Sequence, residues 1–71
     1  MPNKDRIEAA FTYHRPDAAG VEAITELRQR CKALAYTIEA LAPDGREKST
    51  ALTKLEEVMM WASAGIVRPS A

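Results

Sequence analysis

The chain of 71 residues lacks most of the devices that hold small proteins together. It has a single cysteine, Cys31, so no internal disulfide can form and no cysteine metal cluster exists. The only histidine is His14, and the sequence contains neither a metal-ligand spacing nor a phosphate-binding glycine loop. We therefore expect no metal and no cofactor. At this length one hydrophobic core is marginal without such supports or association.

An excess of charge of one sign is also absent. Ten basic and ten acidic residues give a formal net charge of zero, which argues against DNA or RNA polymers held by bulk charge. No apolar run is long enough to span a bilayer, and the N-terminal segment MPNKDRIE does not resemble a secretory signal. We expect a soluble, cytoplasmic protein with no membrane partner.

The clearest feature present is an apolar repeat in the second half of the chain. Its members are spaced by 3, 4, 3 and 4 residues, the rhythm of one buried helical face: Leu52, Leu55, Met59, Ala62 and Ile66. Asp44, three residues before Glu47, indicates a helix start capped by the Asp44 carboxylate. The pattern predicts a helix over 46–67. Trp61 and Met60 fall outside its main face, so we expect them to contribute to a contact surface in a homo-oligomer.

A second apolar repeat predicts a helix over 19–41. Its expected core residues are Ile24, Leu27, Cys31, Leu34, Ala35, Ile38 and Leu41. Beside them Arg28, Lys32 and Tyr36 repeat at i, i+4 and i+8, a basic line that ends in an aromatic ring. The break at residues 42–45, Ala-Pro-Asp-Gly, predicts that the two long helices fold back as an antiparallel hairpin.

The N-terminal part predicts a short helix over 3–11 and a loop over 12–18. Asn3 is a candidate cap, and two to three turns are marginal alone, so we expect this helix to be held by docking. In the loop, Pro16 disfavours helix at the preceding residue. The loop therefore presents Tyr13, His14 and Arg15 on irregular backbone, where binding residues often lie, although a polar turn between helices explains the same pattern. The chain is expected to be one all-α domain over 1–71.

Catalytic patterns are sparse. His14 has no cysteine or serine nucleophile paired with it in a known motif. Glu56 and Glu57 are adjacent, so on a helix they point about 100° apart and do not form a facing acid–base pair. We expect a binding protein and not an enzyme. An aromatic loop residue suits a nucleobase, and arginines suit phosphates.

These residues closely resemble a known family. The segment REKSTALTKLEEVMMWASAGIVR, residues 46–68, is similar to the pattern REKSLALTKLEEAMMWANAAIAR. That pattern marks the phage hairpin domain shared by the anti-CBASS signal sponge, anti-CBASS protein two, and the anti-Thoeris sponge, anti-Thoeris protein one. The segment FTYHRP resembles the family's short YH-x-P loop, so the resemblance covers residues 11–68. Ser63 stands where asparagine is usual, and Gly65 and Val67 stand where alanine is usual.

The resemblance implies a function that composition does not reveal. Such proteins bind cyclic oligonucleotide second messengers made by bacterial antiphage systems in the infected host cytoplasm, and they hold them without cleavage, so that the CBASS effector is not activated. The anti-CBASS members are homohexamers that bind cyclic dinucleotides, such as cyclic GMP-AMP, between protomers. A separate pair of sites takes cyclic trinucleotides.

The resemblance also implies roles for particular residues. Tyr13 matches the loop tyrosine that stacks on a base, and Arg28 lies where the family places a basic residue on the ligand. His14 and Pro16 belong to the same loop and are expected to shape the pocket. Lys32, one turn after Arg28, is a candidate from its position beside it.

Two further residues are associated with the trinucleotide site. Arg68 matches the terminal arginine of the family pattern, and Ser63 replaces an asparagine there, so that a side-chain amide is lost. Arg68 is also explained as a partner of the dipole at a helix C-terminus.

Two alternatives from other functional classes remain at this point. The chain is also consistent with a structural helical-hairpin module that oligomerises and recruits a protein partner. A helix-turn-helix DNA-binding protein is disfavoured by zero net charge and by the tight turn near Pro43.

Overall fold

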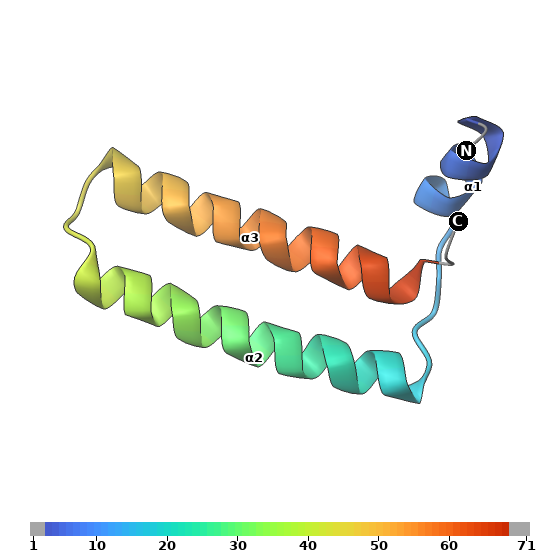
Figure 1. Ribbon diagram of the computed structural model, residues 1–71, viewed down its shortest axis with the longest axis horizontal. Coiled ribbons are helices and arrows are strands. Elements are labelled where there is room, and N and C mark those ends of the chain that lie inside the picture. The colour runs from blue at the N-terminus through green and yellow to red at the C-terminus, as the bar shows by residue number, and fades with distance from the viewer. Residues whose placement is uncertain (1–2, 69–71) are drawn as a thin grey trace.

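A computed structural model describes residues 3–68 of the chain. It contains α1 (Asn3–Phe11), α2 (Ala18–Leu41) and α3 (Arg46–Val67), and no strand within those residues, which confirms the all-helical prediction. α2 and α3 lie side by side and antiparallel, while α1 projects beyond the open end of this hairpin (Figure 1). α2 begins at Ala18, one residue earlier than expected, because Asp17 caps it.

The turn that closes the hairpin is built differently from the expected cap. α3 is preceded by Gly45, whose φ of 156° favours glycine, and no side chain caps it, so the prediction that Asp44 caps α3 is wrong. The Asp44 carboxylate instead accepts a hydrogen bond of 3.0 Å from Lys48 Nζ. The same ammonium donates to the Glu39 carbonyl at 2.8 Å. Lys48, only 8% exposed, therefore joins the turn and the end of α2 to the first turn of α3.

The two long helices bury only part of their apolar surface against each other. Residues from both helices are half-buried along the contact, among them Ile24, Leu27, Cys31, Ala35, Ile38, Leu52, Leu55, Met59 and Ala62. Within residues 3–68, however, no hydrophobic side chain is fully buried. Met60 and Trp61 are 64% and 66% exposed, as their positions outside the main face predicted. One copy of the chain therefore has a contact seam but no closed core.

Two residues predicted for the core of α2 lie outside it. Leu34 is 49% exposed and Leu41 is 79% exposed, whereas Leu27 is half-buried. These leucines recur every seven residues, and a straight helix of 3.6 residues per turn rotates such a line by about 20° per repeat. The line therefore turns away from α3 as α2 proceeds.

The short helix α1 is not docked on its own hairpin. α2 and α3 are the only helices that pack together within residues 3–68, contrary to the expectation that docking holds α1 in place. The apolar side chains of α1 stay open, with Ile7 at 55% and Phe11 at 85% exposure.

Candidate functional site

The segment between α1 and α2 is positioned by its own polar contacts. His14 Nε2 donates a hydrogen bond of 2.8 Å to the carbonyl of Ala9, one of the carbonyls left without a helical partner at the end of α1. This bond folds the loop back against the helix that precedes it. His14 therefore holds the loop against the end of α1.

The other end of the loop is fixed at the start of α2. Asp17 Oδ1 accepts a hydrogen bond of 2.7 Å from the Gly20 amide, a helix N-cap. Gly20 is buried, and a Cβ at this position would lie 3.2 Å from Pro16 Cβ and 3.6 Å from Ile66 Cγ2. Gly20 therefore lies close to both the half-buried Pro16 and Ile66 in the last turn of α3.

The loop presents Tyr13 to solvent. Its side chain is 82% exposed, although the residues on both sides of it along the loop are anchored. Arg68, also exposed, follows α3 at the same open end of the hairpin (Figure 1). The structure thus places an exposed aromatic ring and an exposed guanidinium at one end of the molecule.

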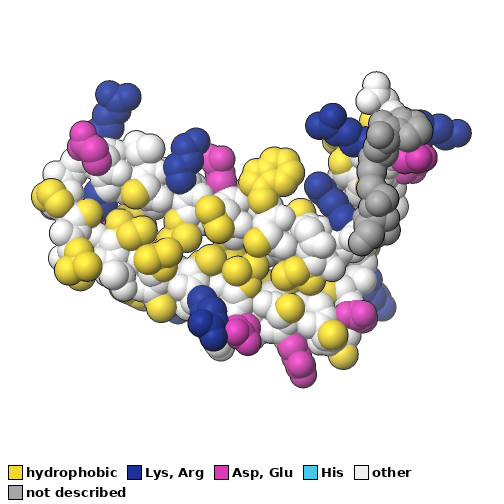
Figure 2. Space-filling model, viewed as in Figure 1, with side chains coloured by type: hydrophobic (Ala, Val, Ile, Leu, Met, Phe, Trp, Pro, Cys, Tyr) yellow, Lys and Arg dark blue, Asp and Glu magenta, His cyan; other side chains and the backbone are white. Residues whose placement is uncertain are grey.

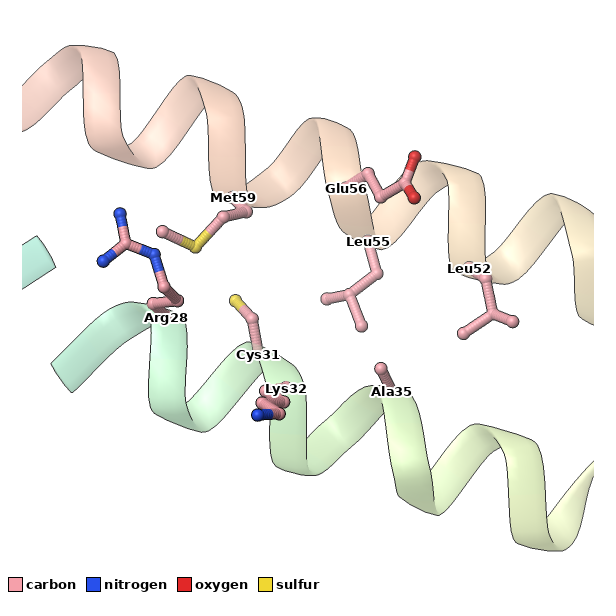
Figure 3. Close-up of a pocket in the computed structure, with 8 residues that line it drawn as sticks. All are labelled: Arg28, Cys31, Lys32, Ala35, Leu52, Leu55, Glu56 and Met59. Carbon is pink, nitrogen blue, oxygen red and sulfur yellow. The ribbon is translucent and has the colours of Figure 1, made fainter. Parts of the chain in front are cut away.

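A second group of predicted residues lies in a groove between α2 and α3. Arg28 and Lys32 stand on the α2 rim and Glu56 stands on the α3 rim (Figure 3). The floor is apolar and is formed by Cys31, Ala35, Leu52, Leu55 and Met59. Figure 3 shows Leu55 pointing across the gap toward Ala35, and Glu56 pointing away from α2. The groove combines two cations with an apolar surface.

The cations of this groove are not neutralised within the described chain. Between residues 3 and 68 the ion pairs are Arg30–Glu26, Lys48–Glu39, Lys48–Asp44 and Lys54–Glu57. Arg28 and Lys32 take part in none of them. Both positive charges are therefore available to an anionic partner.

The loop and the groove are separate within one chain. Tyr13 precedes α2, whereas Arg28 lies ten residues into it, about 15 Å along the helix axis at 1.5 Å per residue. The groove is not lined by Tyr13, Ser63 or Arg68. Ser63 is half-buried in the last part of α3. Within one chain, Arg28 and Lys32 therefore share the groove, whereas the loop and Arg68 share the open end of the hairpin.

The sequence did not reveal two residues that contribute to the loop and to the groove. Gly20 carries no side chain, and only its close contacts with Pro16 and Ile66 reveal that it positions the loop. Glu56, considered in the sequence only as a possible catalytic acid, is exposed and lines the groove from α3. The spacing of four residues between Glu56 and Leu52 was a usable signal, because it places Glu56 at the edge of the buried face.

Two further observations limit the kinds of site that the described residues offer. Among residues 3–68, no three histidine, cysteine or acidic side chains lie together in a way that would hold a metal ion. No helix of this part of the chain has the length and hydrophobicity needed to cross a membrane.

The comparison with protein families gives one match. The model of the Acb2/Tad1 hairpin domain matches residues 3–67, nearly the whole chain and all three helices. No curated protein and no solved structure matches the chain.

Proposed function

The chain belongs to the Acb2/Tad1 hairpin-domain family, and from that membership we propose that it is a phage anti-defence protein that sequesters cyclic oligonucleotide second messengers. In this function the protein lowers the free concentration of the signal in the infected bacterial cytoplasm. The CBASS effector then lacks its activator. Cyclic dinucleotides such as cyclic GMP-AMP are the first ligand class.

The observation that carries this proposal is the anchored loop with its exposed tyrosine. The bond from His14 to the Ala9 carbonyl and the Asp17 cap hold the backbone on both sides of Tyr13. An anchored backbone loses little freedom on binding, and base–aromatic stacking contributes about 1–3 kcal/mol per base. The exposed ring of Tyr13 therefore suits a flat nucleobase.

The groove supplies the complementary chemistry for the phosphates. Arg28 and Lys32 are exposed cations without ion pairs inside the described chain, and charge-assisted hydrogen bonds to phosphate are stronger than neutral ones. Because Arg28 lies about 15 Å along α2 from its first residue and Tyr13 precedes that residue, both reach one ligand when different copies contribute them. The proposed dinucleotide site therefore lies between protomers of a homo-oligomer, a homohexamer by resemblance to the anti-CBASS members.

A second site, for cyclic trinucleotides, is proposed at the open end of the hairpin. Arg68 supplies a guanidinium there, and Ser63 supplies a hydroxyl in place of the family's asparagine. A hydroxyl offers one donor where an amide offers two, so this chain holds a trinucleotide with fewer hydrogen bonds than relatives that carry the amide.

The proposed mechanism is retention of the ligand without turnover. The tyrosine ring and the cations bind bases and phosphates, while His14 already donates to a backbone carbonyl of its own chain. No residue of the proposed site is assigned a role in breaking a phosphodiester bond. The messenger therefore leaves the protein unchanged when the protein is denatured.

The test is a calorimetric titration against a panel of cyclic di- and trinucleotides, followed by heat release and chromatography of the bound ligand. We expect saturable binding of at least one cyclic dinucleotide and recovery of the intact molecule. Absence of binding across the panel would overturn the proposal. Recovery of linear or hydrolysed nucleotide would overturn the mechanism of retention.

The alternative of a structural adaptor module is favoured by one observation, the many exposed apolar side chains. Phe11, Leu41 and Trp61 are at least 66% exposed in one copy of the chain. Stable self-association together with no response to the nucleotide panel would support this alternative over the sponge.

A further inference from the structure

The groove between α2 and α3 has more apolar surface than the proposed nucleotide contact uses. Its volume is about 470 Å³, within the range of roughly 300–1,000 Å³ that small-molecule sites occupy. The floor consists of Cys31, Ala35, Leu52, Leu55 and Met59. Phosphates that bind the cations on the rim leave this floor without a partner. An apolar floor beside a few charged groups is the usual composition of a small-molecule site.

The charges along the groove are unevenly placed. Figure 3 shows Arg28 and Lys32 on α2 toward one end, and Ala35 and Leu52 toward the other. Glu56, the acidic residue of the lining, lies on the α3 side and points away from α2. A bound anion is therefore drawn to the end with the two cations, and an apolar group suits the end with Ala35 and Leu52.

The two cations have the chemistry to hold a carboxylate. Arg28 and Lys32 stand about one helical turn apart, and neither takes part in an ion pair within residues 3–68. A guanidinium donates two parallel hydrogen bonds to a carboxylate, and an ammonium adds a further charge-assisted donor. The alkyl stems of both side chains also extend the apolar surface beside the floor.

The opposite face of the hairpin is arranged differently. α3 lies above α2 in both Figure 2 and Figure 3 but runs in opposite directions, so the two views show opposite faces. In Figure 2, hydrophobic side chains follow the junction of the helices, and charged side chains lie along both outer edges. The close association of two cations with an apolar floor is therefore a property of the groove face.

We propose that the groove binds amphipathic carboxylates, anions that join one carboxylate to an unbranched alkyl chain. The carboxylate accepts hydrogen bonds from Arg28 and Lys32, and the chain lies along the floor toward Ala35 and Leu52. The flexible thioether of Met59 adapts its shape to the chain. A ligand of this kind uses both the cations and the floor, whereas a simple anion or a simple hydrocarbon uses only one of them.

The length of the groove sets the expected length of the chain. Arg28 and Ala35 are seven residues apart, about 10.5 Å along the axis of α2 at 1.5 Å per residue. An extended chain advances about 1.2 Å per bond, because the three backbone bonds of one residue span ~3.6 Å. About nine carbon–carbon bonds therefore cover the floor, which is the length of decanoate.

This inference adds a ligand class and goes beyond the proposed function. Carboxylate binding is measured with no nucleotide present, so the two proposals are tested separately. A protein that binds decanoate but ignores the nucleotide panel would refute the sponge and leave this inference intact. A protein that binds a cyclic dinucleotide but not decanoate would refute this inference alone.

The first test is calorimetric titration with hexanoate, octanoate, decanoate and dodecanoate below their micelle concentrations. We expect the affinity to rise about fourfold per added methylene, which corresponds to ~0.8 kcal/mol, up to decanoate and to level off beyond it. The decyltrimethylammonium cation, whose chain has the same length, should bind about tenfold more weakly. Absence of decanoate binding, as when another copy covers the floor, overturns the proposal. An affinity that is independent of chain length, or equal for the cation, overturns it as well.

The second test compares Arg28→Gln with Arg30→Gln in the same titration. Both arginines are exposed on α2, but Arg30 pairs with Glu26 at 2.9 Å and does not line the groove. We expect Arg28→Gln to weaken decanoate binding about tenfold and Arg30→Gln to leave it unchanged. Equal effects of the two substitutions overturn the proposal.

The third test makes the floor polar. Met59 is half-buried and lines the groove, whereas Met60 is 64% exposed and does not line it. Glutamine resembles methionine in length, so Met59→Gln should reduce the gain in affinity per methylene, and Met60→Gln should retain it. Circular dichroism checks the fold, and the comparison of Arg28→Gln with Arg30→Gln remains decisive if Met59→Gln does not fold. A full gain per methylene in folded Met59→Gln overturns the proposal.

Discussion

The two ends of the hairpin differ in how far the chain satisfies its own side chains. At the closed end, Lys48 donates to the Glu39 carbonyl and the Asp44 carboxylate and is 8% exposed. At the open end, two hydrogen bonds hold the loop, but Phe11 and Tyr13 are more than 80% exposed. At the closed end, the polar side chains bond to other groups of the same chain. At the open end, hydrogen bonds fix the backbone, but the side chains stay exposed to solvent.

This difference separates stability from recognition within one small molecule. A substitution at the closed end acts on a contact that is complete in a single chain. A substitution at the open end removes a side chain that contacts little in its own chain, so its effect appears only when a ligand or another copy is present. Measurements of stability and of ligand binding on the same variants therefore test whether the two ends have these different roles.

The largest effect is expected for Tyr13→Ala, measured by calorimetric titration with the cyclic dinucleotide that binds best. Loss of a stacked base at about 1–3 kcal/mol weakens the complex about five- to hundred-fold for each base contact. The thermal midpoint should stay unchanged because Tyr13 is 82% exposed. Tyr36→Ala, which removes an exposed tyrosine of α2, is the matched control and should bind as the wild type does. Equal losses in the two variants would contradict a specific role for the loop.

The opposite result is expected for Lys48→Met at the closed end, measured by thermal unfolding. Methionine keeps much of the apolar stem but leaves the Glu39 carbonyl and the Asp44 carboxylate without their donor. We expect the midpoint to fall by several degrees, with ligand affinity retained in the folded protein. Lys54→Met, at a side chain 68% exposed and paired only with Glu57, should change the midpoint little. A greater loss for Lys54→Met would mean that the clamp at the closed end does not stabilise the hairpin.

Periodicity predicted the helices because every long apolar repeat in this chain belongs to one. It misplaced Leu34 and Leu41, since a seven-residue repeat and a straight helix diverge along α2. It also misassigned Asp44, because the competing donor, Lys48, is recognisable only when the turn is folded. Local sequence rules rank caps by residue type and do not include a cation one helical turn away.

The residues of the candidate site could be named from the sequence, but their arrangement in space could not. The resemblance picked out Tyr13, Arg28 and Arg68, and their roles stay predictions. Tyr13 and Arg68 lie at the same end of the hairpin, where Gly20 lies close to both Pro16 of the loop and Ile66 of α3. Periodicity describes one helix at a time and contains no such contact between segments.

A smaller effect is expected for Gly20→Ala, which tests whether the open end depends on that close approach. The new Cβ would lie 3.2 Å from Pro16 Cβ, so the loop must shift, while alanine favours helix over glycine by roughly 1 kcal/mol. The two effects oppose each other in stability, and we expect a midpoint within a few degrees of the wild type but weaker nucleotide binding. Gly65→Ala meets no atom within 4 Å and should raise the midpoint without changing affinity. Unchanged affinity in Gly20→Ala would show that the loop position does not matter.

The smallest effect is expected from alkaline pH, which tests whether the positive charge of Lys48 stabilises the closed end. The hydrogen bond to the Asp44 carboxylate, with the negative charges of Asp44 and Glu39, raises the pKa of Lys48 above its ordinary value of 10.5. A group whose pKa is raised by folding contributes its full stabilisation below its unfolded pKa and loses it as the pH rises through the folded pKa. The neutral amine still donates to the Glu39 carbonyl, so less is lost than in Lys48→Met.

Thermal midpoints of the wild type and Lys48→Met, measured at stepped pH, isolate this effect, because every other ionisable group is present in both proteins. We expect the gap between the two midpoints to be constant from neutral pH to about pH 10 and to narrow above it. The Asp44→Asn variant removes the negative charge of the residue whose hydrogen bond and charge raise the pKa of Lys48, so its own gap to Lys48→Met should be smaller and should finish narrowing at a lower pH. A gap that stays constant or widens through the alkaline range would show that the Lys48 charge does not stabilise the closed end.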